Sequence, residues 1–199
     1  MRACLPKPSR DDGLSPRLCY RRWLGRWPTV SSRLMHVTVR AARAGDGVSI
    51  NRLWLSAAAY YTDLDPDHFQ LPADDGLGGS WDDDLTETSD DSLRLVAEVG
   101  GQVVGWLTAR IEQPAANPDR QLVRELSWRR LAIDALVVHR DQWRHGAGTA
   151  LLEAAEDWGR SSGARVVRLD TYAHSAVSVP FYEVHMGYER RSIVFQKWL

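Results

Sequence analysis

The chain has 199 residues, a length that suits one domain with a modest extension. Hydrophobic residues make up 44% of it, but no apolar run approaches the ~20 residues that a membrane-spanning helix needs. The formal net charge of −1 is unevenly divided, because residues 1–34 carry eight Lys or Arg against two Asp, whereas residues 35–199 carry 17 basic and 24 acidic residues, a net −7. An acidic domain argues against nucleic acid as a partner, and we expect no membrane partner either.

Residues 1–34 are rich in Arg, Pro and Ser and show no hydrophobic period. They predict a basic, disordered N-terminal extension before a domain at 35–199; the alternative is that Met35 is the true start of the protein. A secretion signal is not expected because its apolar segment is missing. Both cysteines, Cys4 and Cys19, lie in this extension, so the domain has no Cys nucleophile and no Cys-based metal site. We expect a cytoplasmic protein.

The first half of the domain predicts one strand, two helices and a long loop. The strand covers Val37–Arg40, and Asp46 is a plausible N-cap for a helix from Val48 to about Tyr61. Asp65-Pro66 signals the start of a short second helix that ends at Phe69. Residues 72–92 contain three glycines and eight acidic residues, a composition that predicts a polar loop.

The second half predicts a hairpin followed by alternating strands and helices. Gly100-Gly101 is a two-residue turn between strands at Leu93–Val99 and Gln102–Ile111. A loop or short helix at 114–130 separates the hairpin from the rest. The later elements are a strand at Leu131–Val138, a helix to about Ser161, a strand at Val166–Asp170, a helix at Val179–His185 and a last strand near Arg191–Lys197. This order of elements predicts an α/β (α+β) domain with a mixed sheet.

The turn after the Leu131–Val138 strand has the pattern of an anion site. Gly146 and Gly148 precede an amphipathic helix whose apolar face carries Leu151, Leu152, Ala155 and Trp158. The first N–H groups of a helix have no partner within it and its dipole is positive there, which favours a phosphorylated ligand. The alternative is a tight loop without a ligand. The spacing matches neither the dinucleotide-binding fingerprint nor the P-loop.

A second motif, near the C-terminus, makes the anion-site pattern typical of one protein family. The loop from Trp143 to Gly148 is followed by Phe181-Tyr182 and then by Gly187-Tyr188. Together these motifs resemble the GNAT superfamily of acyl-CoA-dependent N-acetyltransferases, over a range from about His36 to the C-terminus. The resemblance implies a GNAT-like fold: a central, mostly antiparallel sheet that is splayed at the CoA site and flanked by helices. Dimers are common in the family, so a homodimer is also implied.

The resemblance implies acetyl-CoA as co-substrate and no metal. Its pyrophosphate would lie at the turn, and its pantetheine arm would pair with the strand edge. Two departures from the family pattern stand out: Trp143 occupies the usual Gln or Arg position, and Ser175 stands where Asn is frequent. The residues implied in binding are Leu136, Val137, Val138, Trp143, Arg144, His145, Gly146, Ala147, Gly148, Thr149, Ala150, Ser175 and Ser178.

The same resemblance proposes catalytic residues. Tyr182 would be the general acid near the sulfur of CoA; the alternative is a tyrosine that only packs on the sheet. Asp134 interrupts an apolar strand and would be the base, unless it forms a salt bridge with an arginine of the 120–130 loop. Relatives often use no strong base. The other base candidates are Glu98, His139, Asp170 and His174.

The acceptor site is expected between the first helices and the acidic loop. Asp82-Asp83-Asp84 would attract a polyamine, an aminoglycoside or a basic peptide N-terminus, or would simply be solvated. An aromatic set would line the acceptor pocket or pack as core: Trp54, Tyr60, Tyr61 and Phe69.

Two functions follow. The first is an N-acetyltransferase that moves an acetyl group from acetyl-CoA to a primary amine of a small molecule or peptide by direct transfer. The second is a catalytically weak acyl-CoA-binding or sensing module.

Overall fold

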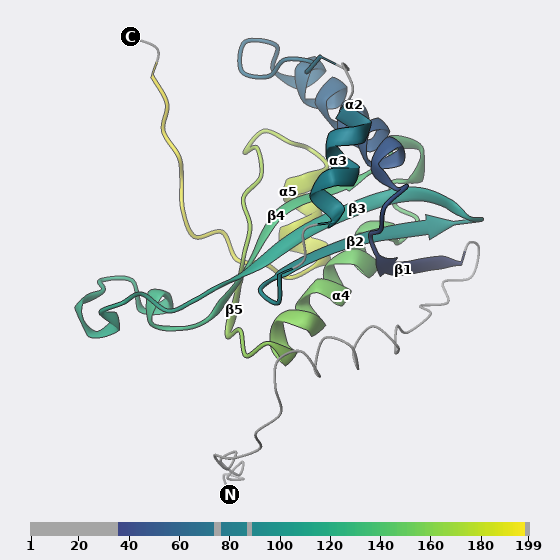
Figure 1. Cartoon of the computed structure of the whole chain (residues 1–199). Coiled ribbons are helices and arrows are strands. Elements are labelled where there is room, and N and C mark those ends of the chain that lie inside the picture. The colour runs from purple at the N-terminus through teal and green to yellow at the C-terminus, as the bar shows by residue number, and fades with distance from the viewer. Residues whose placement is uncertain (1–35, 74–76, 87–88, 198–199) are drawn as a thin grey trace, which may run out of the picture.

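The computed structural model describes residues 36–73, 77–86 and 89–197, so the predicted N-terminal extension lies outside the described residues. Five strands form one open sheet in the order β1-β2-β3-β4-β5 (Figure 1). The strands are β1 Val37–Ala41, β2 Ser92–Val99, β3 Gln102–Glu112, β4 Arg130–Val138 and β5 Val166–Arg168. Neighbours from β1 to β4 are antiparallel, and β5 pairs with β4 in parallel. The mixed, mostly antiparallel sheet predicted from the sequence is therefore confirmed.

Helices cover both faces of this sheet, and each face has its own core (Figure 1). Helices α2 (Gly47–Leu64) and α3 (Leu77–Thr86) lie on one face, where Ile50 and Leu53 are fully buried. Helix α4 (Ala147–Ser161) lies on the other face and buries Leu151, Leu152, Ala155 and Trp158, the apolar face predicted from its sequence. The sheet is thus the middle layer of three.

The remaining elements are short. Three 3₁₀ turns occur in the connections: η1 (Pro118–Arg120), η2 (Arg124–Ser127) and η3 (Arg140–Gln142). The predicted helix at 179–185 is present as α5 (Ser178–Pro180), which continues into a π-helical segment, η4 (Phe181–His185), closed by a bond from the Met186 N–H to the Phe181 carbonyl. The predicted turn at Gly100-Gly101 joins β2 to β3, and both glycines have positive φ, as the tightest hairpins require.

Three sequence predictions of secondary structure are wrong. The polar loop predicted at 72–92 contains α3, because Trp81 and Leu85 pack onto the α2 core and this burial outweighs a poor helix propensity. The helix predicted at Asp65–Phe69 is a single turn.

The third concerns the C-terminal segment. Residues 191–197 form no strand, and Ile193, Val194 and Phe195 are 74%, 89% and 90% exposed. A strong strand propensity in this segment has no neighbouring strand with which to form a ladder. Strand β5 also ends at Arg168, earlier than the predicted Asp170.

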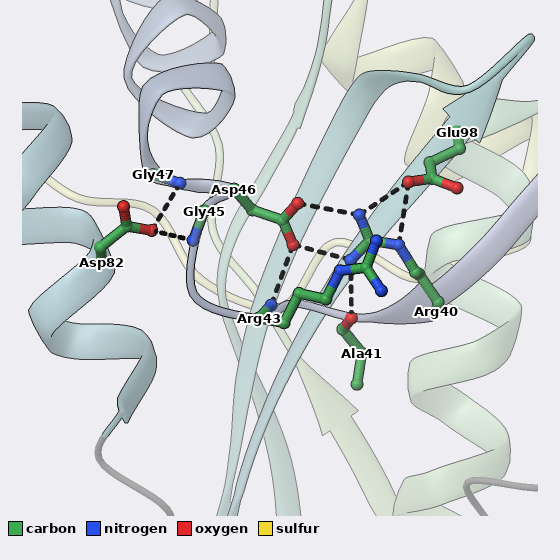
Figure 2. Close-up of polar contacts among 8 residues, drawn as sticks. All are labelled: Arg40, Ala41, Arg43, Gly45, Asp46, Gly47, Asp82 and Glu98. Carbon is green, nitrogen blue, oxygen red and sulfur yellow. Dashed lines mark hydrogen bonds and ion pairs between the residues drawn. The ribbon is translucent and has the colours of Figure 1, made fainter.

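A polar network anchors the start of α2 to the sheet (Figure 2). Arg40 of β1 donates two hydrogen bonds to the Asp46 carboxylate, at 2.7 and 2.8 Å, and two to Glu98 of β2. Burial of Asp46 opposes its ionisation, but the hydrogen bonds from Arg40 and from the Arg43 N–H outweigh this, so the pKa of Asp46 lies below its ordinary value. The predicted N-cap residue is in place, but its side chain binds arginine and does not cap the helix.

The capping role belongs to a residue of α3. One carboxylate oxygen of Asp82 accepts hydrogen bonds from the N–H groups of Gly45 and Gly47, each at 2.9 Å (Figure 2). A carboxylate at a helix start satisfies unpaired N–H groups and complements the dipole. Within the predicted acidic run, Asp82 is therefore a structural tether between α3 and α2.

We expect Asp82→Ala to lower the free energy of unfolding by about 1 kcal/mol, the usual cost of losing a helix cap. For a domain of this size the melting temperature should fall by roughly 2–4 °C. Asp90→Ala, at an exposed turn, is the control and should stay within about 0.5 kcal/mol of wild type. Equal thermal melts for Asp82→Ala and wild type would contradict the tether.

Gly159 lets α4 approach β4 closely. A Cβ at this position would lie 2.8 Å from Cδ2 of Leu131, which is fully buried. Gly→Ala inside a helix normally stabilises by about 1 kcal/mol, whereas overpacking a core costs about 1–3 kcal/mol. We therefore expect Gly159→Ala to be destabilised by about 1 kcal/mol in denaturant unfolding, while the exposed α4 substitution Glu153→Ala is nearly neutral. A stabilised Gly159→Ala protein would show that the contact relaxes freely.

Candidate active site

The sheet opens between β4 and β5. These strands pair only from Arg130↔Val166 to Ala132↔Arg168, after which β4 continues to Val138 with β3 alone beside it. The outer edge of β4 beyond Ala132 therefore offers backbone N–H and C=O groups to an extended ligand. Leu136, Val137 and Val138, the predicted partners of a pantetheine arm, lie on this stretch.

Asp134 lies where the opening begins. The register of β3 and β4 shifts there, since Thr108 is opposite Ala135 and Ala109 is opposite Ile133, which leaves Asp134 as the extra residue of a β-bulge. Its side chain is 38% exposed and is ion-paired with Arg110 of β3. The sequence offered a salt bridge as the alternative role for Asp134, with an arginine of the 120–130 loop as partner. A salt bridge is present, but its partner is Arg110 of the neighbouring strand β3.

A turn at the far end of β4 leads into α4. Arg144 and Gly146 both have positive φ, at 63° and 89°, and reverse the chain between η3 and the helix. The first bond within the helix runs from the Ala150 N–H to the Gly146 carbonyl at 2.9 Å. The N–H groups of Ala147, Gly148 and Thr149 consequently have no acceptor inside the helix, at the positive end of its dipole. This arrangement suits an anion, and the anion site itself stays a prediction.

Side chains around the turn hold it in place. The indole N–H of Trp143 donates to the Val138 carbonyl at 2.8 Å, and Tyr60 of α2 packs edge-on against the same ring, with centroids 5.2 Å apart. Trp143, in the position where Gln or Arg is usual, thus ties the turn to the end of β4. Arg144 and His145 are exposed beside the turn, where a guanidinium can add a charge-assisted bond to phosphate.

Two serines follow β5 along the chain, Ser175 and Ser178. Ser175 is 2% exposed, and its hydroxyl accepts from the Ser178 N–H at 3.0 Å. It also shares a hydrogen bond of 3.2 Å with the Tyr60 hydroxyl, while the hydroxyls of Tyr61 and Ser178 are 3.3 Å apart. The last turns of α2 are therefore linked to the start of α5. The sequence marked both tyrosines as aromatic, but it gave no sign of these hydroxyl contacts.

Tyr182 lies in η4, close to the turn. Phe181 and Tyr188 pack against its ring, and a 3.0 Å bond between Thr149 Oγ1 and His185 Nε2 joins η4 to the start of α4. Burial raises the pKa of Tyr182 above its ordinary value, and the nearby Tyr61 and Asp170 act in the same direction. The hydroxyl therefore remains protonated at neutral pH.

The other base candidates occupy different surroundings. Glu98 is engaged by Arg40, and the ring of His174 packs against Tyr172. His139 accepts a bond from the Asp141 N–H at 3.4 Å. Asp170 follows β5 and is close enough to Tyr182 to affect its pKa. Asp134 on β4, His139 just after β4 and Asp170 just after β5 are therefore the candidates that adjoin the two strands of the opening.

The aromatic set predicted from the sequence divides in two. Tyr60, Tyr61 and Phe69 gather near the serines, where Phe69 contacts Tyr172 with centroids 5.0 Å apart. Trp54 instead joins a second cluster with Trp81 of α3 and Trp106 of β3.

The described residues include no group of three or more His, Cys, Asp or Glu side chains placed to hold a metal ion. Among them, no helix is both long and apolar enough to span a membrane.

Comparisons with known proteins agree with this geometry. A family model described as the acetyltransferase (GNAT) family matches residues 33–188. No curated protein matches the chain.

Several solved structures have a similar fold. A mutant of the BH1408 protein from Bacillus halodurans has a TM-score of 0.70 at 17% identity, with 81% of this chain and 99% of that chain covered. Glucosamine-6-phosphate N-acetyltransferase from Arabidopsis thaliana has a TM-score of 0.58 at 19% identity, covering 81% and 97%. The aminoglycoside N-acetyltransferase AAC(6′)-Iy, in complex with CoA, has a TM-score of 0.56 at 19% identity, covering 84% and 99%. At identities of 17–19%, these similarities show a shared fold and say nothing about the substrate of this chain.

Proposed function

The chain belongs to the acetyltransferase (GNAT) family, and on this premise we propose that it moves an acetyl group from acetyl-CoA to a primary amine of a small molecule or peptide. The observation that carries the proposal is the opening between β4 and β5, which ends at a turn whose unpaired N–H groups suit an anion. Tyr182 lies in η4, the segment that contacts the start of α4.

The residues present fit acetyl-CoA as a substrate. The free N–H groups at the start of α4 suit its pyrophosphate, with Arg144 as an added positive charge. The outer edge of β4 suits the pantetheine arm, which would form strand-like hydrogen bonds with Leu136 and with the N–H of Val138, whose carbonyl already accepts from Trp143. Ser175 and Ser178 are kept in the proposal as residues near the pantetheine arm, although their hydroxyls are already bonded to α2.

The transfer requires one bond to form and one to break. The amine nitrogen attacks the thioester carbonyl, a C–N bond forms, the C–S bond breaks, and the products are an amide and free CoA. Holding both reactants in line accounts for about 7 kcal/mol or more of the barrier. Tyr182, which is protonated at neutral pH, would donate to the departing sulfur. Asp134 or a water beside it would accept the proton of the amine.

A second function has one observation in its favour. Asp134 is engaged by Arg110, so a protein that binds acyl-CoA but turns it over weakly, a sensing module, remains the competing proposal. The homodimer, the cytoplasmic location and the disordered extension remain predictions from the sequence.

We expect Tyr182→Phe to lower kcat by about 10²-fold, within the range for a positioned proton donor, and to change the Kd of acetyl-CoA by less than about twofold. Release of free CoA with saturating amine measures the first, and calorimetric titration measures the second. Tyr188→Phe is the matched control, because its hydroxyl bonds to Glu156 at 2.8 Å and serves packing. If both variants keep wild-type kcat, Tyr182 is not the acid.

We expect Gly146→Val to raise the Kd of acetyl-CoA by about tenfold, because a β-branched residue at φ 89° distorts the turn that presents the N–H groups. Gly101→Val is the matched control: Gly101 has φ 76° and equally open surroundings, but lies in the β2–β3 turn. Gly101→Val should strain the backbone about as much as Gly146→Val, but it should leave the Kd of acetyl-CoA unchanged. Equal affinities in both variants would remove the turn from the binding site.

A further inference from the structure

A hollow of about 300 Å³ lies on the face of the sheet that carries α2 and α3. Its lining comes from α2, α3 and the three central strands, and it includes Asp134 at the bulge of β4. The pyrophosphate turn and Tyr182 are not among its lining residues. It is thus a separate space that meets the opening between β4 and β5 at one residue.

The floor of the hollow is apolar and aromatic. Trp81 and Trp106 meet edge to face with centroids 5.0 Å apart, and Trp54 packs against both from behind. Trp106 is 4% exposed and Ile50 is fully buried, so this floor is well supported. Indole rings of this kind favour contact with apolar or aromatic groups and with cations above their faces.

The lining also carries charges of both signs: the carboxylates of Asp84 and Asp134 and the guanidinium groups of Arg94 and Arg110. Asp84 is exposed on α3, and Asp134 extends from the bulge and is held by Arg110. A ligand ammonium group would share the Asp134 carboxylate with Arg110, and Asp84 offers it a second, exposed carboxylate. Because β5 leaves β4 after Ala132, a nitrogen held at Asp134 lies at the start of the opening, where the thioester is expected.

We propose that this hollow receives the acceptor, and that the acceptor is a small primary amine with one compact apolar body, such as an aromatic ring on a short arm. The inference rests on the proposed function and adds the substrate class. The ammonium group would pair with Asp134 and Asp84, and the apolar body would lie against Trp81 and Trp106.

Size and lining argue against larger polar amines. Ligand sites in proteins span about 300–1,000 Å³, so this hollow is at the lower limit and does not hold several sugar rings. A long polyamine would bring its further ammonium groups towards Arg94 and Arg110, because the described lining offers them no third carboxylate.

The test uses the full chain with acetyl-CoA and three amines: 2-phenylethylamine, spermidine and kanamycin. We expect kcat/KM for release of CoA to be at least tenfold higher with 2-phenylethylamine than with either of the others. Thr108→Phe fills the hollow from β3 and should lower kcat/KM for 2-phenylethylamine at least tenfold through KM, with the Kd of acetyl-CoA unchanged. Thr38→Phe, at an exposed position on β1, is the matched control.

Asp84→Asn is a second variant that leaves the floor intact, and it should raise KM for 2-phenylethylamine about tenfold while acetyl-CoA still binds. Quenching of tryptophan fluorescence by 2-phenylethylamine gives a readout that does not depend on turnover, and Thr108→Phe should abolish it. Preference for spermidine or kanamycin, or full activity and quenching in both variants, would overturn the inference while leaving the transferase intact. Failure to bind acetyl-CoA, or binding without release of CoA in the presence of any amine, would overturn the proposed function itself.

Discussion

The site depends on one interruption of strand pairing. Parallel pairing of β5 with β4 stops after Ala132 and Arg168, and everything proposed about acyl transfer uses the space that opens there. The bulge at Asp134 coincides with this point and places a carboxylate within the apolar run from Leu131 to Val138. A continuous parallel ladder would satisfy the edge of β4 internally and leave no backbone groups for a ligand.

The helices on the two faces of the sheet have different roles. On one face, α4 packs closely through Gly159 and presents its unpaired N–H groups beside the strand edge. On the other face, α2 and α3 are held together by Asp82 and enclose the tryptophan-floored hollow. One substrate is expected along the edge and the other from the hollow, so the two would meet near Asp134. The tyrosines at the end of α2 join these parts by their bonds to Ser175 and Ser178.

The sequence predicted the features that depend on local pattern. The amphipathic period of α4, the glycines of its first turn and the two-glycine hairpin each determine backbone geometry within a few residues, and all three are present. Features that depend on distant contacts were missed. Helix α3 forms because Trp81 reaches the core of α2, although glycines and acidic residues weaken its local propensity. The ion pair of Asp134 with Arg110 depends on the register of β3 and β4, which the bulge shifts. The aromatic residues of α2 separate into two clusters because Trp54 contacts Trp81 and Trp106, whereas Tyr60 contacts Trp143.

The most direct test of the central claim is to follow the acetyl group itself. The full chain would be incubated with acetyl-CoA labelled with ¹³C in the acetyl group and with 2-phenylethylamine, and mass spectra would be recorded for the amine and for the intact protein. The account predicts that the label accumulates on the amine nitrogen in step with release of CoA and never on the protein, as expected for direct transfer in a domain without cysteine. Label that remains on CoA bound to the protein, with no amine in a broad panel acetylated, would contradict the transferase and favour the sensing module.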